Sequence, residues 1–155
     1  MSIIIFIIIL LVLVVVHEFG HYIVAKKNGI RVDEFGFGYP PRAMKLFRKW
    51  DTDFTLNWIP FGGFVKIYGE DPNDENTHGP DSHRAMVNKP ARVQAAVLVA
   101  GVVFNIILAW ILLSVGFMTG LPSTVTNDGM GKYVQNPELT ITQVMKESPA
   151  AEGGL

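Results

Sequence analysis

The stretch "IIIFIIILLVLVVVHEFGHYIVA" (residues 3–25) decides how this chain can fold. Its first fourteen residues, 3–16, are all apolar, and His17, Glu18 and His21 follow with no turn in between. A helix over residues 3–25 is about 34 Å long at ~1.5 Å per residue, which is enough to cross the ~30 Å hydrocarbon core of a bilayer. The pattern therefore predicts a transmembrane helix that carries three ionisable side chains near one end.

A cleaved signal peptide is the alternative interpretation of the same stretch. A signal peptide has basic residues before its apolar run and a small-residue cleavage site after it. No Lys or Arg precedes this run, no such site precedes Lys26, and the apolar pattern continues past the histidines through "YIVA" (22–25). We therefore expect a retained helix.

A second apolar segment, residues 91–119, predicts another spanning helix. Arg92 marks its beginning, and "GLPS" (120–123) ends it. Its several small residues would let helix backbones approach closely in lipid, and one polar side chain, Asn105, lies near its middle. Two such segments predict a mainly α integral membrane protein rather than a soluble domain.

The distribution of charge predicts an orientation in the membrane. Of the thirteen Lys and Arg residues, eleven lie between Lys26 and Arg92 and none precedes the first apolar segment. Because basic residues accumulate on the cytoplasmic side, we expect residues 26–92 at the cytoplasmic face and both chain ends outside. The net charge of −1 gives no indication of a nucleic-acid partner, and the absence of cysteine excludes disulfides and thiolate chemistry.

The segment between the two helices has two parts. Residues 29–68 contain short β-like runs separated by "YPPR" (39–42) and "PFGG" (60–63), which predicts a membrane-associated β-hairpin or re-entrant loop region. Residues 54–69, "FTLNWIPFGGFVKIYG", are expected to form an aromatic hairpin suited to a membrane interface. Residues 69–90 are polar and acidic, and we expect a mobile cytoplasmic loop.

The remainder of the chain follows the second helix. Residues 121–136 are predicted to be a linker rich in Gly, Ser, Thr and Asn, and residues 137–155 begin as a strand and end in small residues. Roughly twenty residues cannot build a core alone. We therefore expect the chain to be part of a longer protein.

The motif "HEFGH" (17–21) fits the pattern HExxH. Residues four apart lie on one helix face, so His17 and His21 can direct ring nitrogens at one metal ion. Glu18 is placed to accept a proton from a metal-bound water, and this donor set favours Zn²⁺. An ionisable residue inside a membrane costs about 2.5 kcal/mol or more, which argues against a chance match.

A catalytic zinc usually has three protein ligands. The soluble zincin extension needs Gly at position 24 and His at 27, and the sequence has Val24 and Lys27, so that family is excluded. His78 and His83 lie in the polar loop, where solvated histidines are expected. Three aspartates are the other candidates: Asp51, Asp53 and Asp128. We expect the third ligand to lie outside these 155 residues.

Four motifs in this order resemble the site-2 protease family of intramembrane zinc metalloproteases, and within it the bacterial branch typified by the regulator of sigma-E protease. They are HEFGH, "EFGFG" (34–38), "IPFGGFVKIYGE" (59–70) and "AGVVFNIILA" (100–109). The final "SPAAEGGL" (148–155) resembles the opening of the PDZ domain that these proteases carry after their second span, so the start of a truncated PDZ domain is expected at 137–155.

The resemblance implies that His17 and His21 are zinc ligands and that Glu18 is the general base. The family's third ligand is an aspartate in an LDG-like motif on a later helix, and no such motif occurs here. The implied activity is endopeptidase cleavage within transmembrane segments of other proteins. The 155 residues alone are expected to be inactive.

The resemblance also implies substrate-binding residues. Gly36, Phe37 and Gly38 fall where the family has a re-entrant β-loop that pairs with the substrate; a simple turn with two glycines is the alternative. Asn105 matches a family asparagine that holds substrate or stabilises the oxyanion, and a helix–helix hydrogen bond is the alternative. The sequence departs from the family pattern at Val102, where a proline is usual.

The implied partners are transmembrane substrates, such as anti-sigma-factor-like proteins or signal-peptide remnants, and the lipid bilayer of the inner membrane. Two other classes remain open. One is a non-catalytic membrane scaffold, and the other is a metal transporter or sensor, which would need further ligands along 91–119, where only Asn105 is present.

Overall fold

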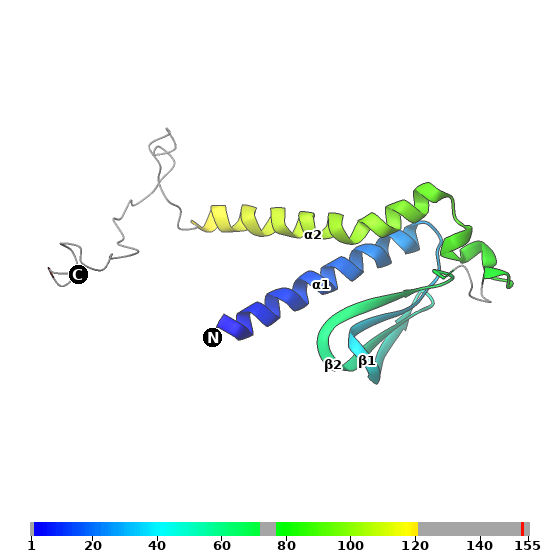
Figure 1. Cartoon of the computed structure of the whole chain (residues 1–155), viewed down its shortest axis with the longest axis horizontal. Coiled ribbons are helices and arrows are strands. Elements are labelled where there is room, and N and C mark those ends of the chain that lie inside the picture. The colour runs from blue at the N-terminus through cyan, green and yellow to red at the C-terminus, as the bar shows by residue number, and fades with distance from the viewer. Residues whose placement is uncertain (1, 72–76, 121–152, 154–155) are drawn as a thin grey trace. The chain divides into compact units, whose positions relative to one another are not determined.

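The computed structural model describes residues 2–71, 77–120 and 153. The predicted arrangement of two long helices with a β region between them is confirmed (Figure 1). The elements in chain order are α1 (Ser2–Lys27), β1 (Val32–Lys49), β2 (Thr52–Ile67), the 3-10 helices η2 (Ser82–Arg84) and η3 (Met86–Asn88), and α2 (Ala91–Thr119). The predicted linker and PDZ start lie outside the described residues, apart from residue 153.

Both α1 and α2 are long and apolar enough to cross a membrane. Only 6% of the apolar window of α1 and 17% of that of α2 is buried within the described structure. The core helix of a soluble protein would be covered by other elements, whereas these helices expose apolar side chains along most of their length. By length, composition and exposure, both helices are candidates for membrane spans.

The two helices pack against each other through small residues. A Cβ atom added at Gly20 of α1 would lie 2.7 Å from the carbonyl oxygen of Ala100 in α2 and 3.0 Å from Cγ of Phe104. Figure 1 shows the helices side by side here and diverging toward the N-terminus of α1. The close approach expected from the small residues of 91–119 is therefore present.

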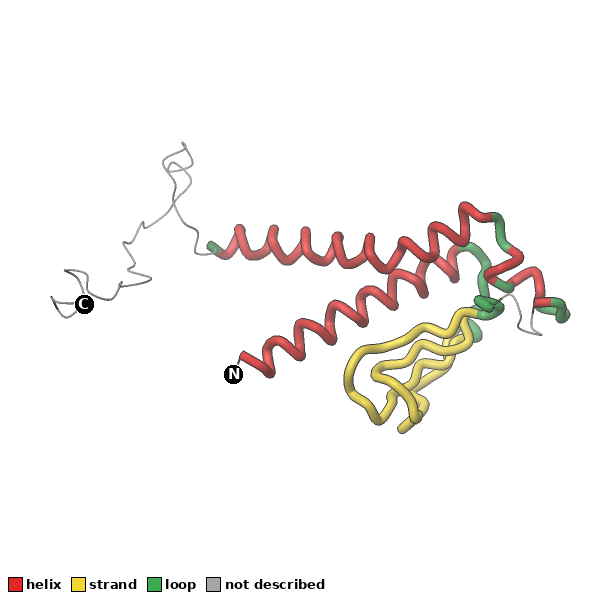
Figure 2. Tube along the Cα trace, in the orientation of Figure 1, coloured by secondary structure: helices red, strands yellow, loops and turns green. Residues whose placement is uncertain are grey.

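The sheet consists of β1 and β2, which pair antiparallel. Each strand bends once, so that the sheet has four legs: 32–37 and 42–49 in β1, and 52–57 and 63–67 in β2 (Figure 2). The bends fall at "YPPR" and "PFGG", where turns were predicted. Leg 32–37 pairs with 63–67, and leg 42–49 pairs with 52–57.

A third set of pairs joins 32–37 to 52–57. In the pairs from Glu34–Asp53 to Phe37–Leu56 the residue numbers rise together, so these two legs run in the same direction. The order across the sheet is therefore 42–49, 52–57, 32–37, 63–67. The predicted hairpin over 54–69 is wrong, because leg 32–37 lies between the two legs of β2. Two buried side chains support the middle pairing: Thr52 Oγ1 donates to the carbonyl of Val32 (2.8 Å) and Asn57 Nδ2 donates to that of Gly38 (3.1 Å).

An aromatic and aliphatic core joins the sheet to the end of α1. The Tyr22 ring lies edge-on to the rings of Phe35 and Phe54, with centroids 5.7 and 5.6 Å apart. Ala25 is fully buried beside it. The core cluster also contains Ile30, Val32, Ile67, Met86 and Val97. This core fixes the sheet relative to the helical turn that carries His21.

Residues 77–90, predicted as part of a mobile loop, pack against the sheet. Ala85 and Met86 are buried, and the backbone N–H of Met86 donates to the carbonyl of Tyr68 (2.9 Å). The N–H of Val87 donates to the carbonyl of Gly69 (3.1 Å). This part of the segment therefore continues the sheet edge beyond residue 67.

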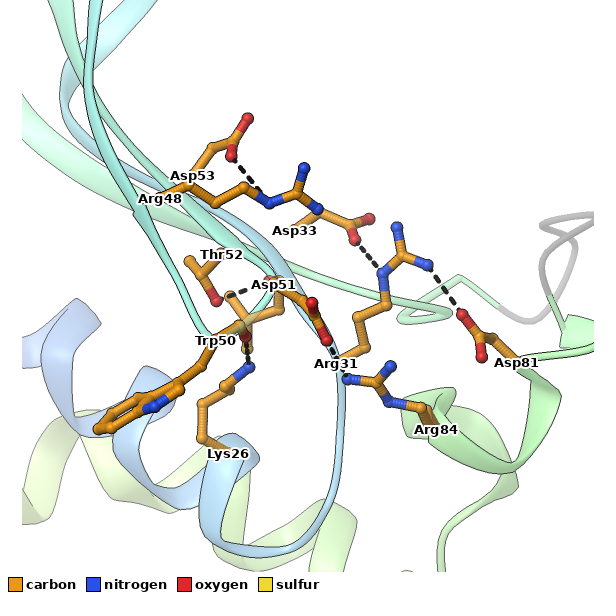
Figure 3. A network of polar contacts seen from close by, with 11 residues as sticks. Lys26, Arg31, Asp33, Arg48, Trp50, Asp51, Thr52, Asp53, Asp81 and Arg84 are labelled. Carbon is orange, nitrogen blue, oxygen red and sulfur yellow. Dashed lines mark hydrogen bonds and ion pairs between the residues drawn. The ribbon is translucent and has the colours of Figure 1, made fainter.

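A polar network closes the end of the sheet nearest α1 (Figure 3). Lys26 Nζ donates to the carbonyl of Trp50 in the β1–β2 turn. Arg84 of η2 pairs with Asp51 at 3.1 Å, and its hydrogen bond lowers the pKa of the Asp51 carboxyl. Arg31 also pairs with two aspartates, Asp33 at 2.7 Å and Asp81 at 2.9 Å.

Candidate metal centre

His17 and His21 lie on one face of α1, one turn apart. Their ring centroids are 4.8 Å apart and the rings meet edge-on at 75°. The face they share is the one that packs against α2, because each ring has its nearest polar partner on that helix. The one-face arrangement expected from the HExxH spacing is present.

The partner of His21 defines which of its nitrogens can bind a metal. His21 Nδ1 lies 2.6 Å from the carbonyl oxygen of Val97. A carbonyl oxygen only accepts hydrogen bonds, so Nδ1 carries the hydrogen, and in the neutral imidazole the lone pair is then on Nε2. A metal-bound histidine usually donates its other ring N–H to an outer partner, and a backbone carbonyl is one of the common partners.

His17 packs on a glycine of α2. A Cβ atom at Gly101 would lie 2.5 Å from Nε2 and 2.6 Å from both Cδ2 and Cε1 of the ring. On its other side, His17 Nδ1 lies 3.3 Å from Nδ2 of Asn105. The Asn105 Oδ1 atom is buried and has no hydrogen-bond partner. Gly101 therefore makes room for the ring, and Asn105 supplies its polar neighbour.

Glu18 contacts the sheet. It lines a cavity of about 230 Å³ together with His21, Glu70 and Val65 of leg 63–67, and Val97 and Leu98 of α2 line the same cavity. The Val65 backbone is in hydrogen-bonding contact with the Glu18 carboxylate, and a Cβ atom at Gly63 would lie 3.9 Å from Glu18 Cγ. The carboxylate thus lies between a histidine and the edge of the sheet.

Gly36 and Phe37 lie in the interior of the sheet, and Gly38 follows them before the bend of β1. Gly36 pairs with Phe64 on one side and Thr55 on the other. The space at its Cα is taken up by the side chains of Phe64 and Asn57, and Gly38 has a φ of +77°, which favours glycine. Among the described residues that line the cavity beside Glu18, none comes from 36–38.

The donor set fits a metal ion in part. Two imidazoles on one face, one with its Nε2 free, and an adjacent carboxylate beside a cavity match the ligands and base of a zinc hydrolase. Within residues 2–71 and 77–120, no group of three His, Cys, Asp or Glu side chains is close enough to hold an ion. His78 and His83 are exposed, as expected for solvated histidines.

Sequence reasoning did not single out Val97 and Gly101. The Val97 contact uses a backbone carbonyl, which every residue has, so the sequence carries no signal for it. Gly101 belongs to the small residues of 91–119, and that pattern indicated a close helix approach without indicating which histidine it would meet.

Comparison with known proteins defines the class. A candidate zinc metalloprotease of Nostoc sp. is 34% identical over 152 residues, which are 97% of this chain and 38% of that protein. One of Brucella suis is 34% identical, with 99% of this chain and 39% of the relative covered. The regulator of sigma-E protease RseP of Escherichia coli is 37% identical over 76% of this chain and 26% of its own length.

The first two relatives are zinc metalloproteases by name, the class that the histidine pair and adjacent glutamate indicate, and the third is a protease by name. The model of peptidase family M50 matches residues 5–150. The chain belongs to peptidase family M50, and its resemblance to the site-2 proteases is confirmed. It spans between about a quarter and two fifths of the length of the relatives named above.

Proposed function

We propose that the full-length protein is an intramembrane zinc metalloendopeptidase that cleaves transmembrane segments of other proteins. His17 and His21 are the zinc ligands that this chain contributes, and Glu18 is the general base. The observation that carries the proposal is the position of Glu18, between His21 and the edge of leg 63–67 in a helix with lipid-facing composition. The 155 residues alone are inactive, because the third ligand lies elsewhere in the protein.

A Zn²⁺ ion held by His17 and His21 would supply Lewis-acid chemistry: it would polarise the scissile carbonyl and lower the pKa of the attacking water. Glu18 takes a proton from that water and delivers it to the leaving amine. The Val65 backbone contact holds the carboxylate at the cavity, and Val97 holds His21 with Nε2 free. The closely packed helix pair keeps these groups away from lipid.

The substrate binds as an added strand along leg 63–67. In the part of the chain that the structure describes, this leg pairs with β1 along one edge only, and its residues Val65 and Ile67 line the cavity beside Glu18. A transmembrane segment unwound for cleavage has free backbone groups, and strand addition satisfies them. Gly36, Phe37 and Gly38 support substrate binding by holding this leg. Gly36 and Phe37 are paired on both sides, and the Gly38 carbonyl accepts a hydrogen bond from Asn57 Nδ2.

The sheet enters the membrane interface from the cytoplasmic side of the inner membrane, with residues 26–92 on that side and both chain ends outside. Large side chains at and beside the bends of β1 and β2 are exposed and suit such an interface: Tyr39, Trp58, Ile59 and Phe61. Labelling of cysteines placed at positions 75 and 128 tests this topology. The two sites are expected to react from opposite sides, and reaction from one side overturns it.

The catalytic assignment is tested in the full-length protein with a transmembrane substrate. Glu18→Gln should abolish cleavage while zinc stays bound, and His21→Ala should lose both zinc and cleavage. His83→Ala is the matched control, because His83 is an exposed histidine that does not line the cavity beside Glu18. It should retain both. Cleavage by Glu18→Gln, or normal zinc content in His21→Ala, refutes the assigned roles.

A further inference from the structure

The two histidines have their Nδ1 atoms directed at the same helix. Nδ1 of His21 meets the carbonyl of Val97, and Nδ1 of His17 meets the side chain of Asn105, two turns further along α2. α2 thus contacts the outer nitrogen of both rings. For His21 the chemistry is fixed, because a carbonyl can only accept.

A histidine that binds a metal through Nε2 must carry its hydrogen on Nδ1, and that N–H needs an acceptor. The side chain of Asn105 has one acceptor atom, Oδ1, and this is the atom that is buried without a partner. A half-turn of the amide exchanges Oδ1 with Nδ2, two atoms of nearly equal size. After this exchange Oδ1 occupies the place of Nδ2, 3.3 Å from His17 Nδ1, and accepts a hydrogen bond from the Nδ1–H group.

We propose that Asn105 is the positioning residue of His17: its Oδ1 accepts a hydrogen bond from His17 Nδ1, which directs Nε2 to the metal. Asn105 then does for His17 what the Val97 carbonyl does for His21. This inference rests on the proposed function, and it replaces direct contact with substrate or oxyanion as the main role of Asn105.

Outer partners of metal-bound histidines typically affect metal affinity by 10–100-fold when they are removed. In the full-length protein, Asn105→Leu should therefore weaken Zn²⁺ binding about 10–100-fold in a chelator competition. Asn105→Asp keeps an acceptor at the same place and should bind Zn²⁺ as tightly as the wild type or more tightly. Ser114→Ala is the matched control on α2, because the Ser114 hydroxyl donates to the Trp110 carbonyl in its own helix. It should leave affinity unchanged.

If Asn105 binds substrate or the oxyanion instead, the opposite result is expected. Asn105→Leu would then bind Zn²⁺ normally and lose only cleavage, and that result overturns the proposal. If Asn105→Leu changes neither the Zn²⁺ affinity nor cleavage, Asn105 makes only a helix–helix contact. That result also overturns the proposal. Equal losses in Asn105→Leu and Asn105→Asp would also contradict a role that requires only an acceptor.

The wild-type protein offers a test that does not depend on a folded variant. Nitrogen NMR of ¹⁵N-histidine-labelled, zinc-loaded protein should show His17 with a protonated Nδ1 and a metal-bound Nε2. Zinc on Nδ1 overturns the proposal. If the wild type binds zinc and His17→Ala does not weaken it, the proposed ligand role fails instead, and the two failures are thereby distinguished.

Discussion

Gly101→Ala is the substitution that most directly tests how α2 shapes the metal centre. The added methyl would lie 2.5 Å from Nε2 of His17, and ordinary contact begins near 3.4 Å, so the ring must move by about 0.9 Å. Metal–ligand distances tolerate only about 0.2 Å. The displaced ring cannot keep its coordination, and zinc affinity should fall at least 10–100-fold, about 1.4–2.7 kcal/mol.

The same substitution should not weaken the helix pair. Alanine stabilises a helix interior by about 1 kcal/mol relative to glycine, and the atoms that must move belong to a side chain. The metal-free protein should therefore melt at or near the wild-type temperature while zinc binding, measured by chelator competition, is lost. Val102→Ala, at an exposed neighbouring position, is the control and should change neither. Zinc affinity of Gly101→Ala within threefold of the wild type would refute the geometry.

Three other predictions concern the scaffold. Gly20→Ala should lower the melting temperature of the metal-free protein, because its Cβ meets the backbone of Ala100 and the helices must separate; a wild-type melting temperature would contradict this. Thr52→Val removes a buried hydrogen bond to the Val32 carbonyl and should cost about 1 kcal/mol in thermal unfolding, whereas Ser114→Ala should be neutral. Arg84 lowers the pKa of Asp51 below 3.8, so this pairing stabilises the fold above that pH and is lost as the pH falls through the lowered pKa. Arg84→Gln should therefore move the acid-unfolding midpoint to higher pH, and an unchanged or lower midpoint would contradict the pairing.

The sequence predicted those features that depend on local pattern. The apolar segments 3–25 and 91–119 predicted α1 and α2 to within two residues at each end, because length and hydropathy suffice to identify a candidate membrane span. The HExxH spacing predicted that His17 and His21 share a face, since that follows from 3.6 residues per turn alone.

Features that depend on contacts between distant segments were not predictable in the same way. The pairing of 32–37 with 52–57 brings together legs that are separated in the sequence by leg 42–49, and no local pattern specifies it. The polar composition of 69–90 indicated a mobile loop, yet the buried side chains of Ala85 and Met86 are enough to dock its second half. The position of residues 77–90 is therefore determined by the burial of these two apolar side chains and not by the polar average composition of residues 69–90.

The geometry of α1 and α2 also accounts for ionisable residues within an apolar helix. A polar group left unsatisfied in hydrocarbon costs several kcal/mol. Nδ1 of His21 is satisfied by the Val97 carbonyl, Nδ1 of His17 lies against Asn105, and the Glu18 carboxylate is met by the Val65 backbone. Each contact comes from α2 or the sheet, so none exists in an isolated α1. The three side chains are therefore compatible with a membrane only once α2 and leg 63–67 are in place. The same packing places Glu18 and His21 at one cavity and His17 against Gly101 and Asn105.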